Sequence, residues 1–411
     1  MEGPLLTRHP ATLTEVVEGG LCIGCGLCEA LAKGLTMDWQ GGVLRPRGNV
    51  IAAEEATILD ACPGAVVAAH LERDQTVDPV WGAYRQLVMA WSGEPEVRYR
   101  AATGGVLTGL ARHALISGQA EFVLHAGPHP TEALLSHWVI SDTPDQVLEN
   151  SGSRYAPVSV LAGLAAALDR DRPFVLVAKP CDISAARRLA RTDRRLAENC
   201  VAMLTMVCGG ASNQSKTLDA LRLMGVDPKE AAAFRYRGEG NPGPHRVTLV
   251  DGSNRTLSYQ DMWADEGSWA IQPRCKLCAD PIGEAADIAA ADCWPGGAPT
   301  GEDEGFNGVL VRTQRGADLL ASAVDAGMIV RGRVLDPADF TNWQPHNVRK
   351  TAAVPARLRG LAAAGQPIPQ LVDLRTADRD AVCPDPETQQ AGAQDRARSG
   401  KFTETARVRR V

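Results

Sequence analysis

The chain has 411 residues, of which 45% are hydrophobic and 22% charged. These proportions exclude a wholly disordered, collagen-like or coiled-coil chain, and the length predicts two or three globular domains. The formal charge is −6, from 43 basic and 49 acidic residues. It argues against a dedicated nucleic-acid binder, because such proteins owe much of their affinity to a basic surface.

The sequence indicates a cytoplasmic protein with no membrane span. No apolar stretch approaches the roughly 20 residues of a transmembrane helix, and the first twenty residues lack a signal-peptide pattern. The eleven cysteines are therefore expected to serve metal or redox chemistry rather than disulfides.

The predicted elements alternate between strands and helices after a small cysteine-containing module, residues 1–72, and a polar connector, 73–78. Strands are predicted at 85–91, 121–125, 174–178, 201–207, 307–313 and 328–334, and helices at 105–117 and 316–327. This alternation predicts an α/β fold. Polar residues dominate residues 373–411, which are expected to be a disordered tail whose Cys383 is not a ligand.

Three cysteines of the N-terminal module have iron–sulfur spacing. Cys22, Cys25 and Cys28 are each separated by two residues, and a remote Cys62 is followed by proline. This is the cysteine pattern of bacterial ferredoxins, and it predicts one 4Fe-4S cluster. A structural zinc site is the alternative, although zinc usually takes cysteine pairs from separate loops.

A second set of cysteines is dispersed along the chain. Cys181 and Cys208 each follow a predicted strand, and Cys275 and Cys278 share a short loop. Because the carboxyl ends of parallel strands meet at one edge of a sheet, these thiolates can meet and would suffice for a second 4Fe-4S cluster. The alternative is a zinc knuckle at the Cys275–Cys278 loop plus two buried thiols. Cys293 is a spare candidate ligand.

Two polar loops are candidates for binding a cofactor. The first precedes the helix at 105–117, where glycines expose N–H groups and the helix dipole favours an anion such as a pyrophosphate. The second, Ser151 to Tyr155, can contact phosphate, ribose or a flavin ring. An ordinary glycine turn and a plain surface loop are the alternatives. No Gly-x-Gly-x-x-Gly motif follows a first predicted strand, so a Rossmann nicotinamide site is not supported.

Taken together, these segments resemble the coenzyme F-420 hydrogenase/dehydrogenase beta-subunit family over roughly residues 15–350. That family includes deazaflavin-reducing subunits, 7-hydroxymethyl chlorophyll a reductase and the ferredoxin-dependent 8-vinyl reductase of divinyl chlorophyllide. The resemblance is carried by the eight cysteines and by Ala102–Thr108, Ser151–Tyr155, Lys179–Ile183, Val207–Gly210, Cys275–Asp280 and Ala286–Ile288.

The resemblance implies FAD and two 4Fe-4S clusters as cofactors. It implies a ferredoxin-like iron–sulfur module at 1–72, an α/β core for FAD and the second cluster at 79–300, and a C-terminal α/β extension of this core at 301–372. The resemblance assigns two loops to FAD, with the residues Thr103, Gly104, Gly105, Val106, Ser151, Ser153, Arg154 and Tyr155. Lys179 departs from the family pattern and is expected to place a cation near the flavin or the second cluster, with a surface lysine as the alternative. The catalytic candidates are Lys179, Tyr155 and His125.

Three functions remain open on this basis. The first is a reductase that passes electrons from reduced ferredoxin, or a similar one-electron donor, through the clusters and FAD to a small organic substrate as hydride. The second is an electron-transfer subunit of a larger complex that reduces a deazaflavin or nicotinamide coenzyme. The third is a non-enzymatic zinc scaffold. Homo-oligomerisation is compatible with each.

An arginine-rich stretch is a candidate docking face for an acidic ferredoxin. One helix following Cys181 is expected to carry Arg187, Arg188, Arg191, Arg194 and Arg195. A solvated helix face balanced by Asp193 and Glu198 is the alternative.

Overall fold

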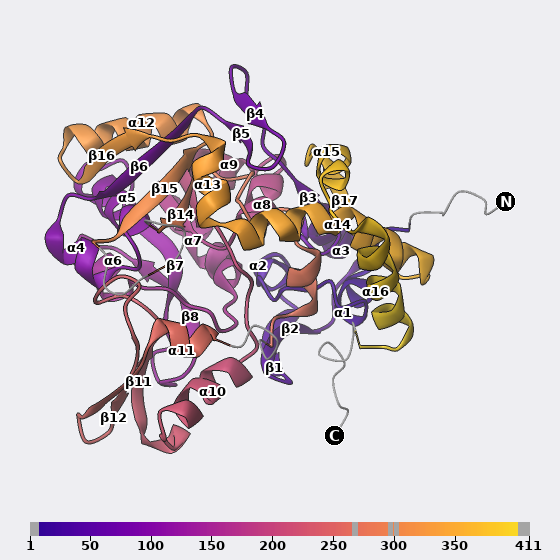
Figure 1. Cartoon of the computed structure of the whole chain (residues 1–411), viewed down its shortest axis with the longest axis horizontal. Coiled ribbons are helices and arrows are strands. Elements are labelled where there is room, and N and C mark those ends of the chain that lie inside the picture. Colours follow the sequence, from indigo (N-terminus) through magenta and orange to yellow (C-terminus); the bar gives the residue numbers. More distant parts are fainter. Residues whose placement is uncertain (1–7, 265–269, 295–298, 300–303, 402–411) are drawn as a thin grey trace.

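The computed structural model describes residues 8–264, 270–294, 299 and 304–401. Its centre is an eight-stranded sheet, in which parallel strands β14, β10, β9 and β7 are flanked by antiparallel strands. In spatial order the strands are β16 (Ile329–Val334), β6 (Gln86–Ser92), β15 (Phe306–Val311), β14 (Ile288–Cys293), β10 (Cys200–Met206), β9 (Phe174–Val177), β7 (Phe122–Pro128) and β8 (Ser136–Ser141) (Figure 1).

Helices cover both faces of this sheet, because alternate side chains of its buried strands point to opposite sides. On β9, Phe174 and Leu176 belong to one apolar cluster, whereas Val175 belongs to another on the opposite face. The first face packs against α7 (Leu164–Asp169), α8 (Pro180–Leu189) and α9 (Arg194–Asn199), and the second against α5 (Val106–Ile116), α6 (Pro144–Glu149) and α12 (Gln314–Asp325). The predicted α/β fold is confirmed, and the predicted strands and helices agree with the observed bounds to within three residues.

An insertion follows β10 and forms a smaller unit beside the sheet (Figure 1). Its three-stranded antiparallel sheet has its own apolar cluster, which includes Phe234, Tyr236 and Val247. Its elements are α10 (Ser215–Leu223), β11 (Ala231–Arg235), β12 (His245–Leu249), β13 (Asn254–Leu257) and α11 (Tyr259–Trp263). The short helices α4 (Pro95–Arg100) and α13 (Pro337–Trp343) and the hairpin of β4 (Thr76–Asp78) and β5 (Gly82–Tyr84) complete the larger unit.

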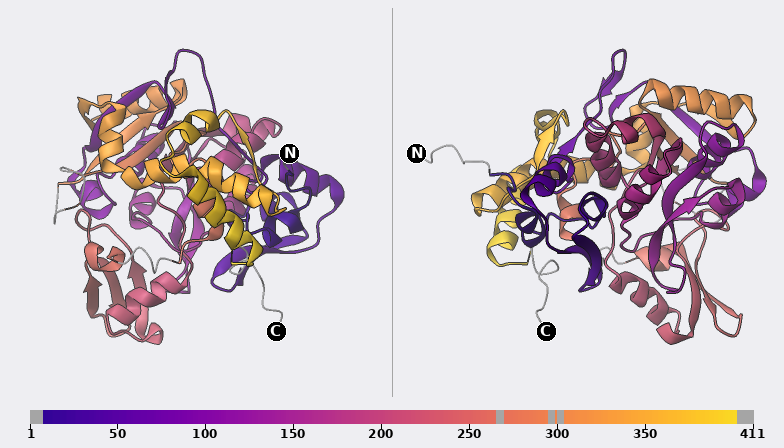
Figure 2. Two further views of the ribbon diagram at one scale, coloured as in Figure 1. Left: turned by 45° about the vertical axis from the view of Figure 1, so that its right-hand side comes forward. Right: turned by 180° about the vertical axis from the view of Figure 1, so that it is seen from behind.

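The N-terminal module packs against the C-terminal segment, so it is not a separate unit (Figure 2). Strand β3 pairs in parallel with β17, with Val67 beside Leu371. The module contains α1 (Leu13–Glu18), α2 (Leu27–Leu31), β1 (Leu35–Gln40), β2 (Val43–Gly48), α3 (Ala52–Ala61) and β3 (Val66–Ala68). The C-terminal segment contains α14 (Pro345–Ala363), β17 (Gln370–Val372), α15 (Thr376–Ala381) and α16 (Pro386–Arg398).

The structure differs from the expectation of a disordered tail at 373–411. Helices α15 and α16 occupy most of this range, and residues 402–411 lie outside the described part of the chain. The buried side chains of α16 are the small Ala393 and Ala397, which give almost no hydrophobic periodicity in the sequence. Close packing against Gly360 of α14 supplies the contact instead, and Cys383 is buried against Ala352 and Ala353.

Candidate functional site

Four thiols surround one small cavity in the N-terminal module. Cys22 and Cys25 lie in the loop that enters α2, Cys28 lies in its first turn, and Cys62 follows α3; all four line this cavity. We call them the first cysteine group. Burial and the neighbouring Cys22 thiol raise the pKa of Cys62 to about 11.

The glycines of this loop are required by its geometry. Gly24 and Gly26 have φ values of 72° and 87°, which glycine adopts without the steric penalty that other residues incur. A Cβ at Gly24 would lie 2.5 Å from the carbonyl oxygen of Leu44, and one at Gly26 would lie 2.6 Å from the amide nitrogen of Ala162. The loop therefore contacts β2 on one side and the core of the larger unit on the other.

The other four predicted ligands meet at the edge of the main sheet. Cys181 lies in the first turn of α8 after β9, Cys208 follows β10, and Cys275 and Cys278 lie in and directly after the short 3₁₀ helix Pro273–Leu277. We call them the second cysteine group. Burial raises the pKa of each thiol, and their electrostatic interactions link Cys181 to Cys208 and Cys278, and Cys275 to Cys208 and Cys278.

Both groups have the donor chemistry of an iron–sulfur site. Each supplies four sulfur ligands, and the amide of Ala211 donates to Cys275 Sγ at 3.2 Å, a contact of the kind that tunes a cluster. Within the described ranges, no three His, Cys, Asp or Glu side chains are placed to hold a single metal ion. The zinc alternatives therefore gain no support from this geometry. Cys293 packs among apolar side chains at the end of β14, and Cys200 is buried in the core.

Polar contacts connect the two cysteine groups. Lys179 Nζ forms an ion pair with Asp182 Oδ2 at 2.7 Å and donates to the carbonyl of Val158. The segment after Val158 contacts the first group, because Ser159 Oγ donates to the carbonyl of Gly24. The Lys179 ammonium interacts electrostatically with both Cys25 and Cys181. Lys179, which was predicted to bind FAD, is thus brought between the cysteine groups.

Arg274 forms a second connection between them. It is 4% exposed, and its guanidinium donates to the carbonyl of Leu277 in the second group and to that of Pro63 in the first, both at 2.9 Å. The short distance between these loops is therefore set by direct contacts of one buried cation.

A buried arginine brings the two predicted cofactor loops together. Arg237 forms an ion pair with Asp292 at 2.9 Å, donates to Thr103 Oγ1 at 3.1 Å and lies 3.5 Å from the Tyr155 hydroxyl. Burial alone would lower the pKa of Arg237, but Asp292 and Tyr155 outweigh it and raise that pKa. The rings of Tyr259 and Trp294 lie 5.2 and 5.5 Å from its guanidinium carbon. These six residues are the Arg237 cluster.

Unpartnered polar groups border this cluster. His245 is fully buried, and neither ring nitrogen has a hydrogen-bond partner within the described residues. Burial, followed by the charges of Arg237 and Lys216, lowers the pKa of His245 to about 3. The side-chain amide of Asn241 is likewise buried without a partner in the described part of the chain. Buried polar atoms of this kind are normally satisfied, so they favour a polar ligand here.

The remaining predicted residues of the two loops have different surroundings. Ser151 Oγ is buried without a partner among the residues described, and Ser153 interacts with Tyr155. Arg154 lies near Arg235 and Tyr236, and burial lowers its pKa to about 10.

The glycine turn before α5 packs against β15. Asn307 Oδ1 accepts from the Val106 amide at 3.2 Å, and a Cβ at Gly104 would lie 2.8 Å from the same oxygen. Gly105 takes a left-handed conformation at the start of the helix. One of the amides at this helix N-terminus, that of Val106, is therefore already bonded to a side chain of the protein.

His125 is not brought to the Arg237 cluster by any described contact. Its Nε2 lies 2.8 Å from Ser141 Oγ across the β7–β8 pair, and burial lowers its pKa to about 4. Sequence reasoning also missed Arg237, Asp292 and Tyr259. No motif in the sequence distinguishes Arg237 from the neighbouring Arg235.

The Arg237 cluster adjoins the second cysteine group. The Ser212 amide donates to the carbonyl of Tyr155 at 2.9 Å, and the adjacent Ala211 is the residue that donates to Cys275 Sγ. Two cysteine groups and a cation–aromatic cluster therefore follow one another in space. Two groups of four sulfur donors are typical of redox proteins that carry iron–sulfur clusters.

Comparison with known proteins identifies the family. The chain belongs to the coenzyme F420 hydrogenase/dehydrogenase beta-subunit family: residues 87–165 match its N-terminal part and residues 171–334 its C-terminal part. It is 25% identical over 242 residues to the beta subunit of F420-dependent formate dehydrogenase 1 of Methanococcus maripaludis. The matched stretch covers 58% of this chain and 59% of that relative.

Two further relatives extend the likeness. The chain is 22% identical over 312 residues to a subunit of the F(420)H(2) dehydrogenase of Methanosarcina mazei, covering 75% of this chain and 83% of the relative. Its fold is similar to a chain of the F420-reducing [NiFe] hydrogenase complex from Methanosarcina barkeri, with a TM-score of 0.54, 20% identity and coverage of 67% of this chain and 91% of that one.

The prediction of FAD as a cofactor is wrong. The family and these relatives are named for coenzyme F420, and none of the comparisons indicates FAD. The FAD assignment had come from the family resemblance, and the relatives point to another coenzyme. A ferredoxin donor and a small organic substrate gain no support and stay predictions. None of the described helices is long and apolar enough to cross a membrane.

Proposed function

We propose that this chain is an electron-transfer subunit of a larger oxidoreductase complex and that it exchanges electrons between iron–sulfur clusters and coenzyme F420. Each cysteine group would hold one cluster. The relatives are named as subunits of F420-dependent formate dehydrogenase, F(420)H(2) dehydrogenase and F420-reducing hydrogenase, which favours a subunit over a reductase acting alone. The observation on which this proposal rests is that the first cysteine group, the second cysteine group and the Arg237 cluster lie next to one another in this order.

The contacts between these three sites support a relay. Arg274 joins the two cysteine groups, and Ala211 and Ser212 join the second group to Tyr155. Clusters transfer one electron at a time, whereas a deazaflavin is reduced by two electrons together with protons. Two reduced clusters together hold the two electrons that reduction of one coenzyme molecule requires.

The Arg237 cluster has the chemistry to receive a deazaflavin. Flat rings of Tyr259 and Trp294 provide faces for a planar heterocycle, and the Arg237 guanidinium favours a ligand that gains negative charge on reduction. The Tyr155 hydroxyl, held near Arg237, is assigned as the group that donates a proton. Burial raises its pKa, while Arg237 acts in the opposite direction, so it remains protonated at neutral pH.

Iron analysis of cysteine variants tests the clusters. Chain purified without oxygen should contain iron and sulfide, and Cys25→Ser and Cys278→Ser should each remove roughly half of the iron. Cys293→Ser is the matched control and should retain all of it, because Cys293 lies in an apolar cluster. Equal iron in Cys25→Ser and Cys293→Ser would contradict the first site.

Binding of the coenzyme is tested separately. Arg237→Met should weaken F420 binding, measured by quenching of F420 fluorescence, and should leave the iron content unchanged. Arg246→Met is the control, because Arg246 lies on β12 of the same smaller unit and pairs with Glu239. Equal affinity for F420 in Arg237→Met and wild type would place the coenzyme elsewhere.

A further inference from the structure

Cations of the C-terminal segment contact the loops that carry the second cysteine group. Lys350 of α14 donates to the carbonyl of Gly209 at 2.5 Å and to that of Cys208 at 3.4 Å. Arg357, two turns further along α14, donates to the carbonyl of Lys276 at 2.9 Å, and Arg379 of α15 donates to that of Ala279 at 2.5 Å. Cations of the C-terminal segment thus contact the backbone at or next to three of the four cysteines of the second group, namely Cys208, Cys275 and Cys278.

All three cations lie beyond residue 334, where the match to the family ends. They therefore belong to a part of this chain that the family comparison does not cover. The same segment packs on the N-terminal module through β17 and α14, so its position relative to both cysteine groups is fixed.

Lys350 has the most direct electrostatic relation to the thiols. Its ammonium lies against the backbone of one ligand residue, because it donates to the carbonyls of Cys208 and Gly209. A positive charge beside a cluster favours the more negative, reduced form, because reduction adds an electron to the cluster. The contacts of Arg357 and Arg379 are instead with Lys276 and Ala279, which are not ligands.

We propose that Lys350 is a positioning residue which fixes the Cys208–Gly209 turn and raises the reduction potential of the cluster at the second cysteine group. The inference rests on the proposed function, because it requires a cluster at that group. In the proposed relay, a higher potential at the second group favours electron transfer from the cluster of the first group to that of the second.

The test is a redox titration of the whole chain followed by electron paramagnetic resonance, with iron content measured on every sample. Lys350→Met should retain the iron and shift the potential of the second cluster to a more negative value. We expect about a tenfold change in its one-electron equilibrium constant, which corresponds to ~59 mV. Lys350→Arg should restore most of the wild-type potential, because it retains the charge.

Arg349→Met is the matched control. Arg349 is exposed on the same helix and carries the same charge, so this variant should leave both potentials unchanged. If Lys350→Met loses iron, two other variants provide the comparison, Lys350→Gln and Arg357→Met. A second-cluster potential equal to that of wild type in both variants overturns the proposal. Equal shifts in Lys350→Met and Arg349→Met also overturn it. Wild-type chain without iron would instead contradict the proposed function.

Discussion

Burial between β7 and β8 fixes the protonation state of His125. Its pKa is about 4 in the folded chain, compared with about 6.5 for an unperturbed histidine. The ring is therefore neutral at pH 7 and bonds to Ser141. Selecting it as a catalytic candidate from sequence relied on residue type alone, and a buried histidine with a hydroxyl partner has a sufficient structural explanation.

This burial predicts a pH dependence of stability. As the pH falls from about 6.5 to 4, the unfolded chain takes up a proton at His125 that the folded chain does not, so folding is weakened by about 3 kcal/mol. The His125→Gln variant lacks the imidazole, whereas all other titrating groups are common to the variant and wild type. The difference between the two proteins therefore isolates the contribution of His125. Urea unfolding should show the stability difference between wild type and variant decreasing as the pH is lowered. A difference that is constant with pH would contradict the burial of the ring.

Arg237 illustrates why part of the site could not be found from sequence. Its partners Thr103 and Asp292 are 134 and 55 residues away, and no local pattern relates them. The cysteines differ in this respect, because their type and spacing restrict their chemistry. Sequence therefore selected the cysteines of both groups together with Thr103 and Tyr155, whereas Arg237, Asp292 and Tyr259 required the fold.

At the scale of elements, capping decides where helices end. The arginine-rich stretch after Cys181 was expected to form one helix, but Asp193 accepts a hydrogen bond from the Leu196 amide and begins a separate helix, α9. Arg187 and Arg188 pair with Asp287 and Asp60, and Arg194 pairs with Glu198. These arginines do not form one unpaired basic face.

Close packing of α14 and α16 depends on Gly360. A Cβ there would lie 2.2 Å from the carbonyl oxygen of Gln390, so Gly360→Ala should separate the helices and destabilise the chain by about 1–3 kcal/mol. Gly392→Ala on α16 is the control, because no described atom lies within 4 Å of its added Cβ, and it should be neutral or stabilising by up to about 1 kcal/mol. Thermal unfolding measures both. Equal melting temperatures for the two variants would contradict this packing.

At the scale of the whole molecule, the last part of the chain completes the structure around both cysteine groups. The sequence divided the chain into consecutive modules, because hydrophobic patterns report only local order. In the structure, β17 pairs with β3 and α15 contacts the segment after Cys278. Pairing of segments some 300 residues apart leaves no periodic signal in the sequence. The packing of the C-terminal segment on the N-terminal module could therefore not be predicted.

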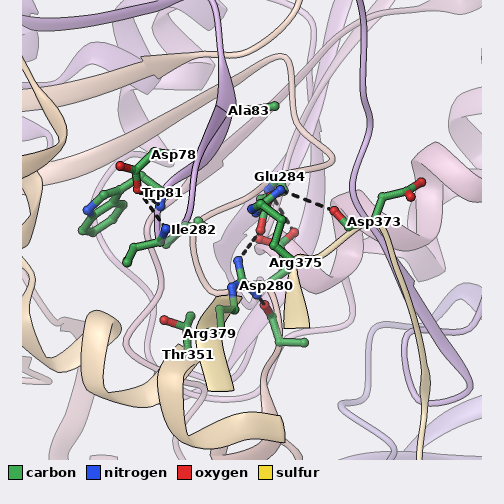
Figure 3. A network of polar contacts seen from close by, with 12 residues as sticks. Asp78, Trp81, Ala83, Asp280, Ile282, Glu284, Thr351, Asp373, Arg375 and Arg379 are labelled. Carbon is green, nitrogen blue, oxygen red and sulfur yellow. Dashed lines mark hydrogen bonds and ion pairs between the residues drawn. The ribbon is translucent and has the colours of Figure 1, made fainter. Parts of the chain in front are cut away.

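A buried carboxylate connects α15 to the rest of the molecule (Figure 3). Glu284 forms ion pairs with Arg375 and Arg379, and both of its oxygens are used. Burial alone would raise the pKa of Glu284, but the two arginines, with Arg312, outweigh it and lower that pKa. The stability from these pairs is therefore present above the pKa of an unfolded glutamate and is lost as the pH falls through the lower folded value.

Removing this carboxylate should release α15. Glu284→Gln leaves two largely buried guanidinium groups without a counter-charge, which costs about 3–5 kcal/mol, and should make residues 376–398 sensitive to limited proteolysis at neutral pH. Asp380→Asn is the matched control, because its partner Arg359 is substantially exposed and such pairs contribute at most about 1 kcal/mol. If both variants resist the protease as wild type does, other contacts hold α15 in place. A Glu284→Gln chain that is cleaved first within residues 376–398 would show that the C-terminal segment detaches before the main sheet unfolds.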